Sequence, residues 1–456
     1  MSFPRFSRNS RAAVLMRSTS SCYCLLVLAM SISVKVQAAE WTAAPDISLR
    51  SGYNDNYRLS VEPDSSVWET NLSASSRFGV AKENQGLFGD AGVRIRRFTG
   101  GTGRNSSDLL NREDYFFNTD GYHQTERNVF RGNINYIRDS LLNSALDETG
   151  SLVNSNATRI SKRLGASWAG TLTERMSFNL GYQYNNVSFT DDLEISRLVP
   201  YKLNQLRASL NYQITPRTVG IFQSIGSIYR PDEVKGLERV TGLDSETWNL
   251  QAGINSAFSE TIDLSILAGY RKTRSDTNFF TGFCLGSNPG ASFPDCDGGI
   301  AVPTETEKGE SNTSGSVYNA SITKRLEKGS LSASIFRTTR PDSRGRLLDS
   351  NQLRLNGVYR LTKMLQFSLP VRYSENETIV NVFGRDANNA VIQNQDERTQ
   401  KFFRITPKIS WRFQREWRLA GEYQYAKNKN REQNTATRNA VYLTLSYVPT
   451  KFSISR

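Results

Sequence analysis

Few residues of this chain have the types and spacing that catalysis requires. The sequence contains one histidine, His123, in the stretch DGYHQTER at a predicted tight turn. A Ser–His–acid enzyme would need that residue in a cleft, whereas a histidine in a turn is usually solvated. The chain also lacks a CxxCH haem motif, a zinc-type cluster of Cys and His, and a glycine-rich phosphate loop. We therefore expect no enzyme, no cofactor and no metal site.

Two cysteines, Cys284 and Cys296, lie in one predicted loop, residues 276–310, which also carries six acidic residues. In a secreted chain, a close-spaced pair favours a disulfide over a metal site. The stretch DCDGG (295–299) superficially resembles a calcium loop, but the remaining oxygen ligands are missing at the required spacing. We expect a disulfide that braces the loop, which either folds inward as a constriction or remains an ordered surface loop.

The N-terminal segment has the features of a secretory signal peptide. Four arginines precede the apolar stretch CYCLLVLAMSISV (22–34), and VQAA follows it as a small-residue cleavage site. We expect residues 1–39 to be removed and residues 40–456 to form one domain. Cleavage lowers the net charge from +13 to about +8. Because secretion removes the chain from the cytoplasm, the positive charge does not indicate nucleic-acid binding.

The stretch LTERMSFNLGYQYNNVSFTDD (172–192) shows which elements carry the remaining polar residues. Its apolar positions from Met176 to Tyr184 alternate with the polar or small positions from Ser177 to Asn185. Such alternation predicts a β-strand with one apolar and one polar face. The strand exceeds the roughly five or six residues common in soluble proteins.

Similar alternating segments recur, and their connections are short and long in turn. LTER (172–175) and LTKM (361–364) are short, whereas 139–156, 276–309, 341–349 and 376–399 are among the long ones. Strict alternation of this kind is typical of an outer-membrane β-barrel, with short periplasmic turns and long extracellular loops. The alternative is a soluble all-β protein with uneven loops.

Eighteen strands can be counted, so both ends of the domain are expected in the periplasm. The predicted strands extend from 46–55 to 435–448 and include 400–413. Sixteen remains an alternative because 113–122 and 330–340 alternate least clearly. The mature chain has no apolar run of about 18 residues that would predict a transmembrane helix. We therefore predict an all-β fold, a transmembrane antiparallel β-barrel in the cell outer membrane. No plug domain fits before the first strand, so an aqueous channel that only loops can narrow is expected.

The polar face of the predicted strands is rich in cations and poor in acids, which are chiefly Asp263 and Glu422. A basic, water-filled wall raises the local concentration of anions. Any single arginine can instead pair with a loop acid or bind lipopolysaccharide near a rim. The predicted lumen-facing basic residues are Arg94, Arg96, Arg163, Arg207, Arg271, Arg354, Arg360, Arg372, Arg404, Lys408, Arg412 and Arg418.

Three stretches, YIRDSLLNSALDETG (136–150), LTERMSFNLGYQYNN (172–186) and VYLTLSYVPTKFSISR (441–456), resemble a family of bacterial outer-membrane β-barrel porins. Members of that family are associated with exopolysaccharide biosynthesis and export operons. The resemblance spans the mature chain through turn and strand residues, and it implies the fold more than the substrate. It implies no catalytic residues.

The sequence thus predicts a basic-walled channel for export of an anionic exopolysaccharide or passage of other anionic solutes. The expected partners are outer-membrane lipid and lipopolysaccharide, together with polysaccharide and periplasmic export components. The alternative is a structural barrel that acts as an adhesin or partner scaffold.

Overall fold

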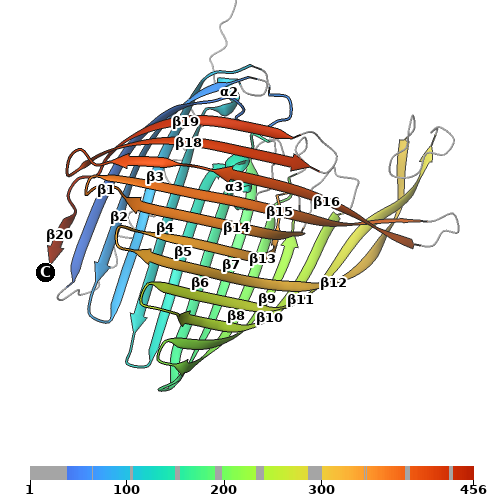
Figure 1. The fold of residues 1–456 in the computed structure, drawn as a ribbon. Coiled ribbons are helices and arrows are strands. Elements are labelled where there is room, and N and C mark those ends of the chain that lie inside the picture. The colour runs from blue at the N-terminus through green and yellow to red at the C-terminus, as the bar shows by residue number, and fades with distance from the viewer. Residues whose placement is uncertain are drawn as a thin grey trace, which may run out of the picture.

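The chain folds into a closed antiparallel β-barrel (Figure 1). The computed structural model describes residues 39–455 apart from 64, 103–105, 149–154, 191–197, 233–240, 286–299, 344, 346, 386–390 and 431–434. Neighbouring strands pair in sequence order, and β1 pairs with β19, which closes the sheet. Closure satisfies the backbone hydrogen bonds that lipid cannot.

The elements follow one another as hairpins around the barrel. Their bounds are β1 (Glu40–Asn54), β2 (Val67–Ala81), β3 (Gln85–Gly100), α2 (Ser107–Leu110), β4 (Arg112–Gln124), β5 (Asn128–Ser140), α3 (Leu141–Glu148), β6 (Thr158–Thr173), β7 (Met176–Thr190), β8 (Tyr201–Thr215), β9 (Thr218–Pro231), β10 (Thr241–Ala257), β11 (Ile262–Leu285), β12 (Ile300–Leu326), β13 (Gly329–Pro341), β14 (Leu347–Arg360), β15 (Leu365–Arg385), β16 (Val391–Ile405), β17 (Lys408–Trp411), β18 (Trp417–Asn430), β19 (Ala436–Tyr447) and β20 (Phe452–Ser455).

These segments occupy eighteen positions around the barrel, which confirms the predicted number. β16 and β17 form one position, because both pair with β15 and with β18 on either side of Thr406 and Pro407. Proline has no N–H to donate to the ladder, which accounts for the interruption of the predicted strand 400–413. The short β20 continues the position of β19 against the start of β1.

The alternating pattern separates an apolar outer face from a more polar inner face. On β7, for example, Leu180 and Tyr182 are exposed whereas Asn185 and Val187 are buried. Large apolar side chains are exposed on nearly every strand, the reverse of a soluble fold. A closed barrel with an apolar exterior spans the bacterial outer membrane, with its short turns in the periplasm and its long loops outside. Among the described residues, no helix combines the length and apolar character needed to cross a membrane.

Two hairpins extend further than the sequence predicts. β11 and β12 remain paired as far as Leu285 and Ile300, although residues 276–309 were predicted to be a loop. β15 and β16 likewise pair as far as Arg385 and Val391 within the predicted loop 376–399. Figure 1 shows both hairpins projecting beyond the neighbouring strands. Polar residues in these segments concealed the extended backbone, because β-pairing outside the membrane does not require an apolar face.

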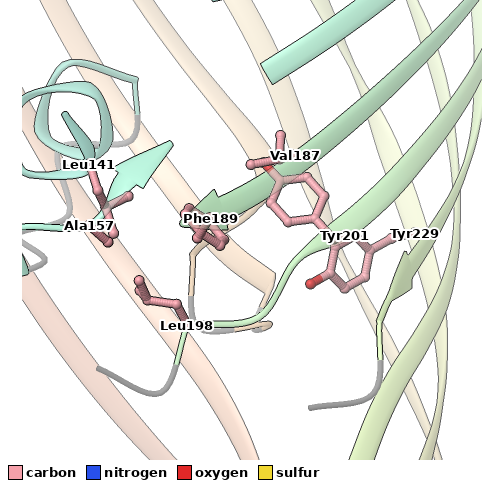
Figure 2. Packing of buried hydrophobic residues seen from close by; sticks show 7 residues of the cluster. All are labelled: Leu141, Ala157, Val187, Phe189, Leu198, Tyr201 and Tyr229. Atoms are coloured by element: carbon pink, nitrogen blue, oxygen red, sulfur yellow. The ribbon is translucent and has the colours of Figure 1, made fainter. Parts of the chain in front are cut away.

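Helix α3 lies inside the loop end of the barrel, between β5 and β6. Leu141 packs with Ala157, Val187 and Phe189 in a buried cluster that also contains Leu198, Tyr201 and Tyr229 (Figure 2). Leu142 and Leu146, one helical turn apart, enter two further buried clusters. Leu142 belongs to a cluster with Tyr57, Val67, Phe98 and Leu110. Leu146 belongs to a cluster with Leu59, Phe402, Ala426 and Ala436.

Together these three clusters connect opposite walls of the barrel. Val187 and Phe189 lie on β7, and Phe402 lies on β16, which is nine positions away in an eighteen-strand barrel. The β13–β14 connection also turns inward, since the Val199 amide donates to the Ser343 carbonyl at 2.9 Å. Loops therefore narrow the lumen, a point that the sequence left open. Among the described residues, however, this packing comes from α3 and its neighbours, and not from the predicted segment 276–310.

Candidate functional site

The inner wall carries four arginines in a single lateral row, immediately on the turn side of α3. Arg354 on β14 is opposite Arg372 on β15, which is opposite Arg404 on β16. Arg404 is opposite Ala426 on β18, and Ala426 is opposite Arg438 on β19. Ala426 also belongs to the cluster around Leu146. We call Arg354, Arg372, Arg404 and Arg438 the arginine row.

Three members of the arginine row stand directly opposite one another on adjacent strands. Neighbouring strands are about 4.8 Å apart, and like charges in directly opposed positions destabilise a sheet. Strand pairing alone therefore does not favour Arg354, Arg372 and Arg404 at these positions. An arrangement of this kind does favour binding of negative charge, since an anion between the guanidinium groups would offset their repulsion.

A cavity of about 600 Å³ lies against the arginine row and extends to β1 and β3. Its wall also includes Arg50 and Arg96, so six arginines stand against two carboxylates, Glu69 and Glu422. Arg50 donates to Glu422 at 2.7 Å and stacks 3.7 Å from the centre of the Tyr442 ring. Arg96 lies 3.1 Å from Asp114 and 4.0 Å from Glu69. These acids thus offset the positive charge of Arg50 and Arg96 on the β1 and β3 side of the cavity.

On the opposite side of the cavity, two glutamines contact three of the arginines. Arg354 donates to the Gln352 amide oxygen at 3.0 Å, and its guanidinium lies 5.0 Å from the centre of the Phe336 ring. Arg372 donates to the same amide oxygen at 3.4 Å, and Arg438 donates to the Gln424 amide oxygen at 3.1 Å. These contacts orient the guanidinium groups.

Other predicted lumen residues lie outside the arginine row. Arg94 on β3 is half-buried opposite Asp114, and Arg163 on β6 is half-buried between Asn135 and Asn185. Arg207 on β8 is exposed and lines a small cavity of about 130 Å³ beneath the β13–β14 connection. These residues lie at separate places on the wall.

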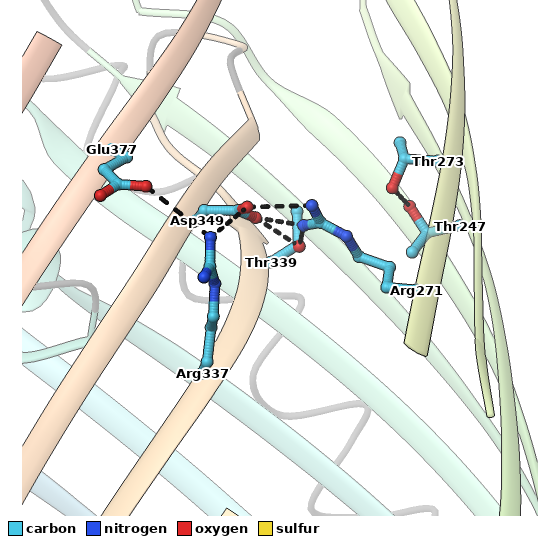
Figure 3. A network of polar contacts seen from close by, with 7 residues as sticks. All are labelled: Thr247, Arg271, Thr273, Arg337, Thr339, Asp349 and Glu377. Atoms are coloured by element: carbon cyan, nitrogen blue, oxygen red, sulfur yellow. Dashed lines mark hydrogen bonds and ion pairs between the residues drawn. The ribbon is translucent and has the colours of Figure 1, made fainter. Parts of the chain in front are cut away.

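Arg271 is held in a buried ion-pair network (Figure 3). It contacts Asp349 through both terminal nitrogens, one of them at 2.9 Å, and Thr339 donates to Asp349 at 2.7 Å. Arg337 lies 3.5 Å from Asp349 and 3.7 Å from Glu377. Asp349 was not among the acids predicted on the inner face, because it lies in the predicted loop 341–349, which the structure assigns partly to β14.

The remaining predicted cations lie toward the short turns. Arg360 ends β14 and Arg418 begins β18, and both are exposed. Lys408 on β17 is opposite Glu422, and the exposed Arg412 follows β17 in the turn. These side chains contribute positive charge near the periplasmic mouth.

Arg438 is the member of the arginine row that was not predicted. On β19 the inner face reads Ala436, Arg438, Ala440 and Tyr442, so apolar residues surround the arginine on its own strand. The pattern therefore did not identify an inner polar face there. The place of Arg438 in the arginine row becomes evident only from the register between β18 and β19.

His123 and the two cysteines are the other residues that the sequence analysis singled out. His123 is exposed at the turn end of β4, opposite Gln85 and Phe130. The Cys284 backbone pairs with Ala301, but its side chain and Cys296 lie outside the described residues. Within the described part of the chain, no three His, Cys, Asp or Glu side chains form a group that could hold a metal ion.

Neither a protein-family model nor a curated protein matches the sequence. Several solved structures resemble the chain, among them three at 11% identity. The match to Acinetobacter baumannii OccAB4 has a TM-score of 0.42 and covers 91% of this chain and 99% of the OccAB4 chain. The match to Pseudomonas aeruginosa OpdK with vanillate has a TM-score of 0.39 and covers 90% of this chain and 99% of the OpdK chain. The match to the ferric-catecholate import receptor Fiu from E. coli has a TM-score of 0.42 and covers 89% of this chain and 81% of the Fiu chain. At these TM-scores the likeness carries no argument about function, and the barrel assignment rests on the strand register.

Proposed function

We propose that this chain is an outer-membrane channel that favours anionic solutes. The observation that carries the proposal is the arginine row, in which Arg354, Arg372 and Arg404 oppose one another on three adjacent strands. Lumen charges tune the selectivity of a barrel without supporting its insertion. A cost in strand pairing is therefore consistent with a role in transport.

The packing of α3 places the arginine row next to a narrowed part of the lumen. Leu146 of α3 and all four arginines line the same cavity of about 600 Å³. A narrow, low-dielectric wall focuses the field of its charges and raises the local concentration of counter-ions. Solutes that pass the helix on this side meet the arginine row at short range.

The solute that we propose is an acidic polysaccharide on its way out of the cell, or a smaller organic anion. The family resemblance of the sequence motivates the first choice, and the charge of the cavity supports both. Export would require periplasmic components that deliver the polysaccharide to the turn end of the barrel. The exposed Arg360, Arg412 and Arg418 would meet an acidic chain there.

A structural role as an adhesin or partner scaffold is the second candidate. The three buried clusters around α3 favour it, because they connect opposite walls within the lumen. A barrel filled in this way could present its loops without conducting solutes.

Liposome swelling separates the two functions. Glucuronate and glucose have similar sizes and differ by one carboxylate, so liposomes that contain the folded protein should admit glucuronate faster. Faster entry of glucose would contradict anion preference. Entry of neither sugar, including after Leu142 and Leu146 are replaced by alanine, would support the structural role.

We also propose that phosphorylated outer-leaflet lipids, including lipopolysaccharide, contact the outside of the loop end. Lys162, Asn186, Lys202 and Arg230 form a lateral row on the outer faces of β6 to β9. Exposed Leu164, Leu206 and Ile228 lie just below this row. Asp232 pairs with Lys202 at 3.0 Å and partly offsets its charge.

Native mass spectrometry of the purified protein with added diphosphoryl lipid A tests this contact. Replacement of Lys162, Lys202 and Arg230 by glutamine should reduce the fraction of lipid-bound protein. An unchanged fraction would contradict the assignment.

A further inference from the structure

A second, smaller cavity lies inside the barrel, between the inner face of β8 to β10 and the β13–β14 connection. Its volume is about 130 Å³, and none of its described lining residues belongs to the cavity at the arginine row. Leu203, Ile225 and Thr247 line it from β8, β9 and β10, and Pro341 and Leu347 line it from the connection. We call it the Tyr229 cavity, after the tyrosine of β9 in its wall.

Two polar atoms in the wall of the Tyr229 cavity have no protein partner. Tyr229 is 2% exposed, and within the described part of the chain neither its hydroxyl nor the Asn249 side-chain oxygen makes a hydrogen bond. Folded proteins rarely leave buried polar atoms unsatisfied, because burial removes the hydrogen bonds that water would make. Both residues line the cavity, so a molecule inside it can supply the two hydrogen bonds.

Arg207 adds positive charge at the level of Asn249. Arg207 on β8 is opposite Ile225 on β9, and Ile225 is opposite Asn249 on β10. Because neighbouring strands are about 4.8 Å apart, the backbones of Arg207 and Asn249 are about 10 Å apart. Arg207 is exposed on the inner face, whereas Tyr229 is buried. The cavity therefore has a cationic end near the lumen and a hydroxyl deeper in the wall.

The charges near the cavity orient a ligand within it. Arg207 and Arg337 are cations in its wall, and no described residue that lines it is acidic. The carboxylates of Asp342 and Asp244 lie close enough to act electrostatically on Tyr229. A negatively charged group is therefore favoured at the Arg207 end and disfavoured at the Tyr229 end.

The apolar part of the wall favours a small organic molecule over water alone. Leu203, Ile225 and Val317 line the cavity together with the polar groups. Water would gain nothing from these side chains, whereas the carbon atoms of a ligand would lose apolar contact with water. An apolar cavity of about 150 Å³ holds benzene, so about 130 Å³ gives room for about six non-hydrogen atoms.

We propose that the Tyr229 cavity binds a short hydroxycarboxylic acid, with its hydroxyl groups at Tyr229 and Asn249 and its carboxylate at Arg207. A hydroxyl group both donates and accepts, so it can satisfy the Asn249 oxygen and the Tyr229 hydroxyl. The guanidinium fork of an arginine matches a carboxylate. The proposal goes beyond the channel function, because binding here does not require the ligand to cross the membrane.

Saturation-transfer NMR on the folded protein in detergent micelles tests the site with three probes of similar size. Glycerate carries a carboxylate and two hydroxyl groups, glycerol lacks the carboxylate, and propionate lacks the hydroxyl groups. Glycerate should bind about tenfold more tightly than either, because each of the others loses contacts that the site provides. Equal affinities for the three probes, or no saturation transfer to glycerate, would overturn the proposal and leave ordered water as the partner of the two buried atoms.

Two variants separate the contributions of the carboxylate and the hydroxyl groups. Arg207→Gln should raise the Kd for glycerate about tenfold and leave the Kd for glycerol unchanged, because only a charge-assisted contact is lost. Tyr229→Phe keeps the ring in its buried cluster, and it should raise the Kd for glycerate and glycerol without affecting propionate. An unchanged Kd for glycerate in Arg207→Gln would overturn the assignment of the carboxylate end.

The matched controls are Arg217→Gln and Tyr212→Phe on the same hairpin. Arg217 is exposed in the turn between β8 and β9, and Tyr212 is exposed on the outer face of β8. Both controls should retain the wild-type Kd for glycerate, and a loss equal to that of Arg207→Gln would contradict a local site. If Tyr229→Phe does not fold, Arg207→Gln and the three probes on the wild type still decide the outcome.

Discussion

At the scale of single residues, the same side-chain type serves two purposes on the inner wall. Arg271 is 5% exposed and is compensated by Asp349, so it contributes to the barrel wall. Arg354 is exposed to the lumen and has neutral contacts with Gln352 and Phe336. The partner of an arginine, rather than its presence on the polar face, thus separates a structural role from a proposed transport role.

Replacement of Asp349 by asparagine should strongly destabilise the barrel. Arg271 would remain buried without a compensating charge, and such a loss costs about 3–5 kcal/mol. The temperature at which the protein loses its fast, folded migration on a gel should therefore fall. Glu310→Gln is the control, because its 3.0 Å pair with Arg274 is exposed and such pairs contribute about 0–1 kcal/mol. Equal temperatures for the two variants would contradict the structural role of Asp349.

The residues of the site could be predicted only in part. Strand alternation placed Arg354, Arg372 and Arg404 on the polar face. Their direct opposition depends on strand register, which follows from hairpin geometry and not from one strand alone. Gln352 and Gln424 attracted no attention in the sequence because a glutamine on a polar face is common. Their contacts with Arg354 and Arg438 become evident only in the folded structure.

At the scale of elements, α3 is the part of the fold that most affects the lumen. The predicted loop 139–156 contains this helix, although its LLNSALDE sequence was not singled out for an inward position. Leu142 and Leu146 bury their side chains against separate clusters from other loops and strands. Such contacts between segments far apart in sequence leave no local pattern, which is why the inward packing could not be predicted.

Replacement of Leu142 and Leu146 by alanine should release α3 and increase the single-channel conductance. Loss of a buried leucine side chain typically costs about 2–5 kcal/mol, and each of these leucines anchors the helix in its own cluster. Leu109→Ala is a suitable control because Leu109 is exposed on α2. A conductance that matches the wild type and the control would show that α3 does not limit passage.

The hairpin formed by β11 and β12 is expected to carry a disulfide between Cys284 and Cys296. The pairing remains a prediction from secretion and close spacing. Mass spectrometry of the non-reduced protein should detect one cross-linked peptide that contains both cysteines. Two thiols that react freely with an alkylating reagent before reduction would contradict it. Because the ring is small, reduction should affect local order more than global stability.

At the scale of the whole molecule, the barrel could be predicted almost completely from the sequence. Each membrane-crossing strand must alternate apolar and polar residues, and short turns alternate with long loops, so strand number and order follow from local patterns. The strand interruption at Pro407 differs from the prediction because proline has no backbone N–H to donate to the strand ladder. The extended hairpins differ from it because they lie outside the membrane, which imposes no alternation of apolar and polar residues there. The interior does not follow from these patterns.

The whole molecule combines an apolar exterior, a lumen narrowed by packed loops, and a positively charged cavity beside the narrowing. The most direct test of its proposed function is the reversal potential of single channels in a planar bilayer under a KCl gradient. We predict preference for chloride over potassium, and a reduced preference when Arg354, Arg372 and Arg404 are replaced by glutamine. The matched control replaces Arg97, Arg138 and Arg230, which lie on the outer face, and should retain the wild-type value. Preference for potassium, or an equal reversal potential in the wild type and the lumen variant, would contradict the account.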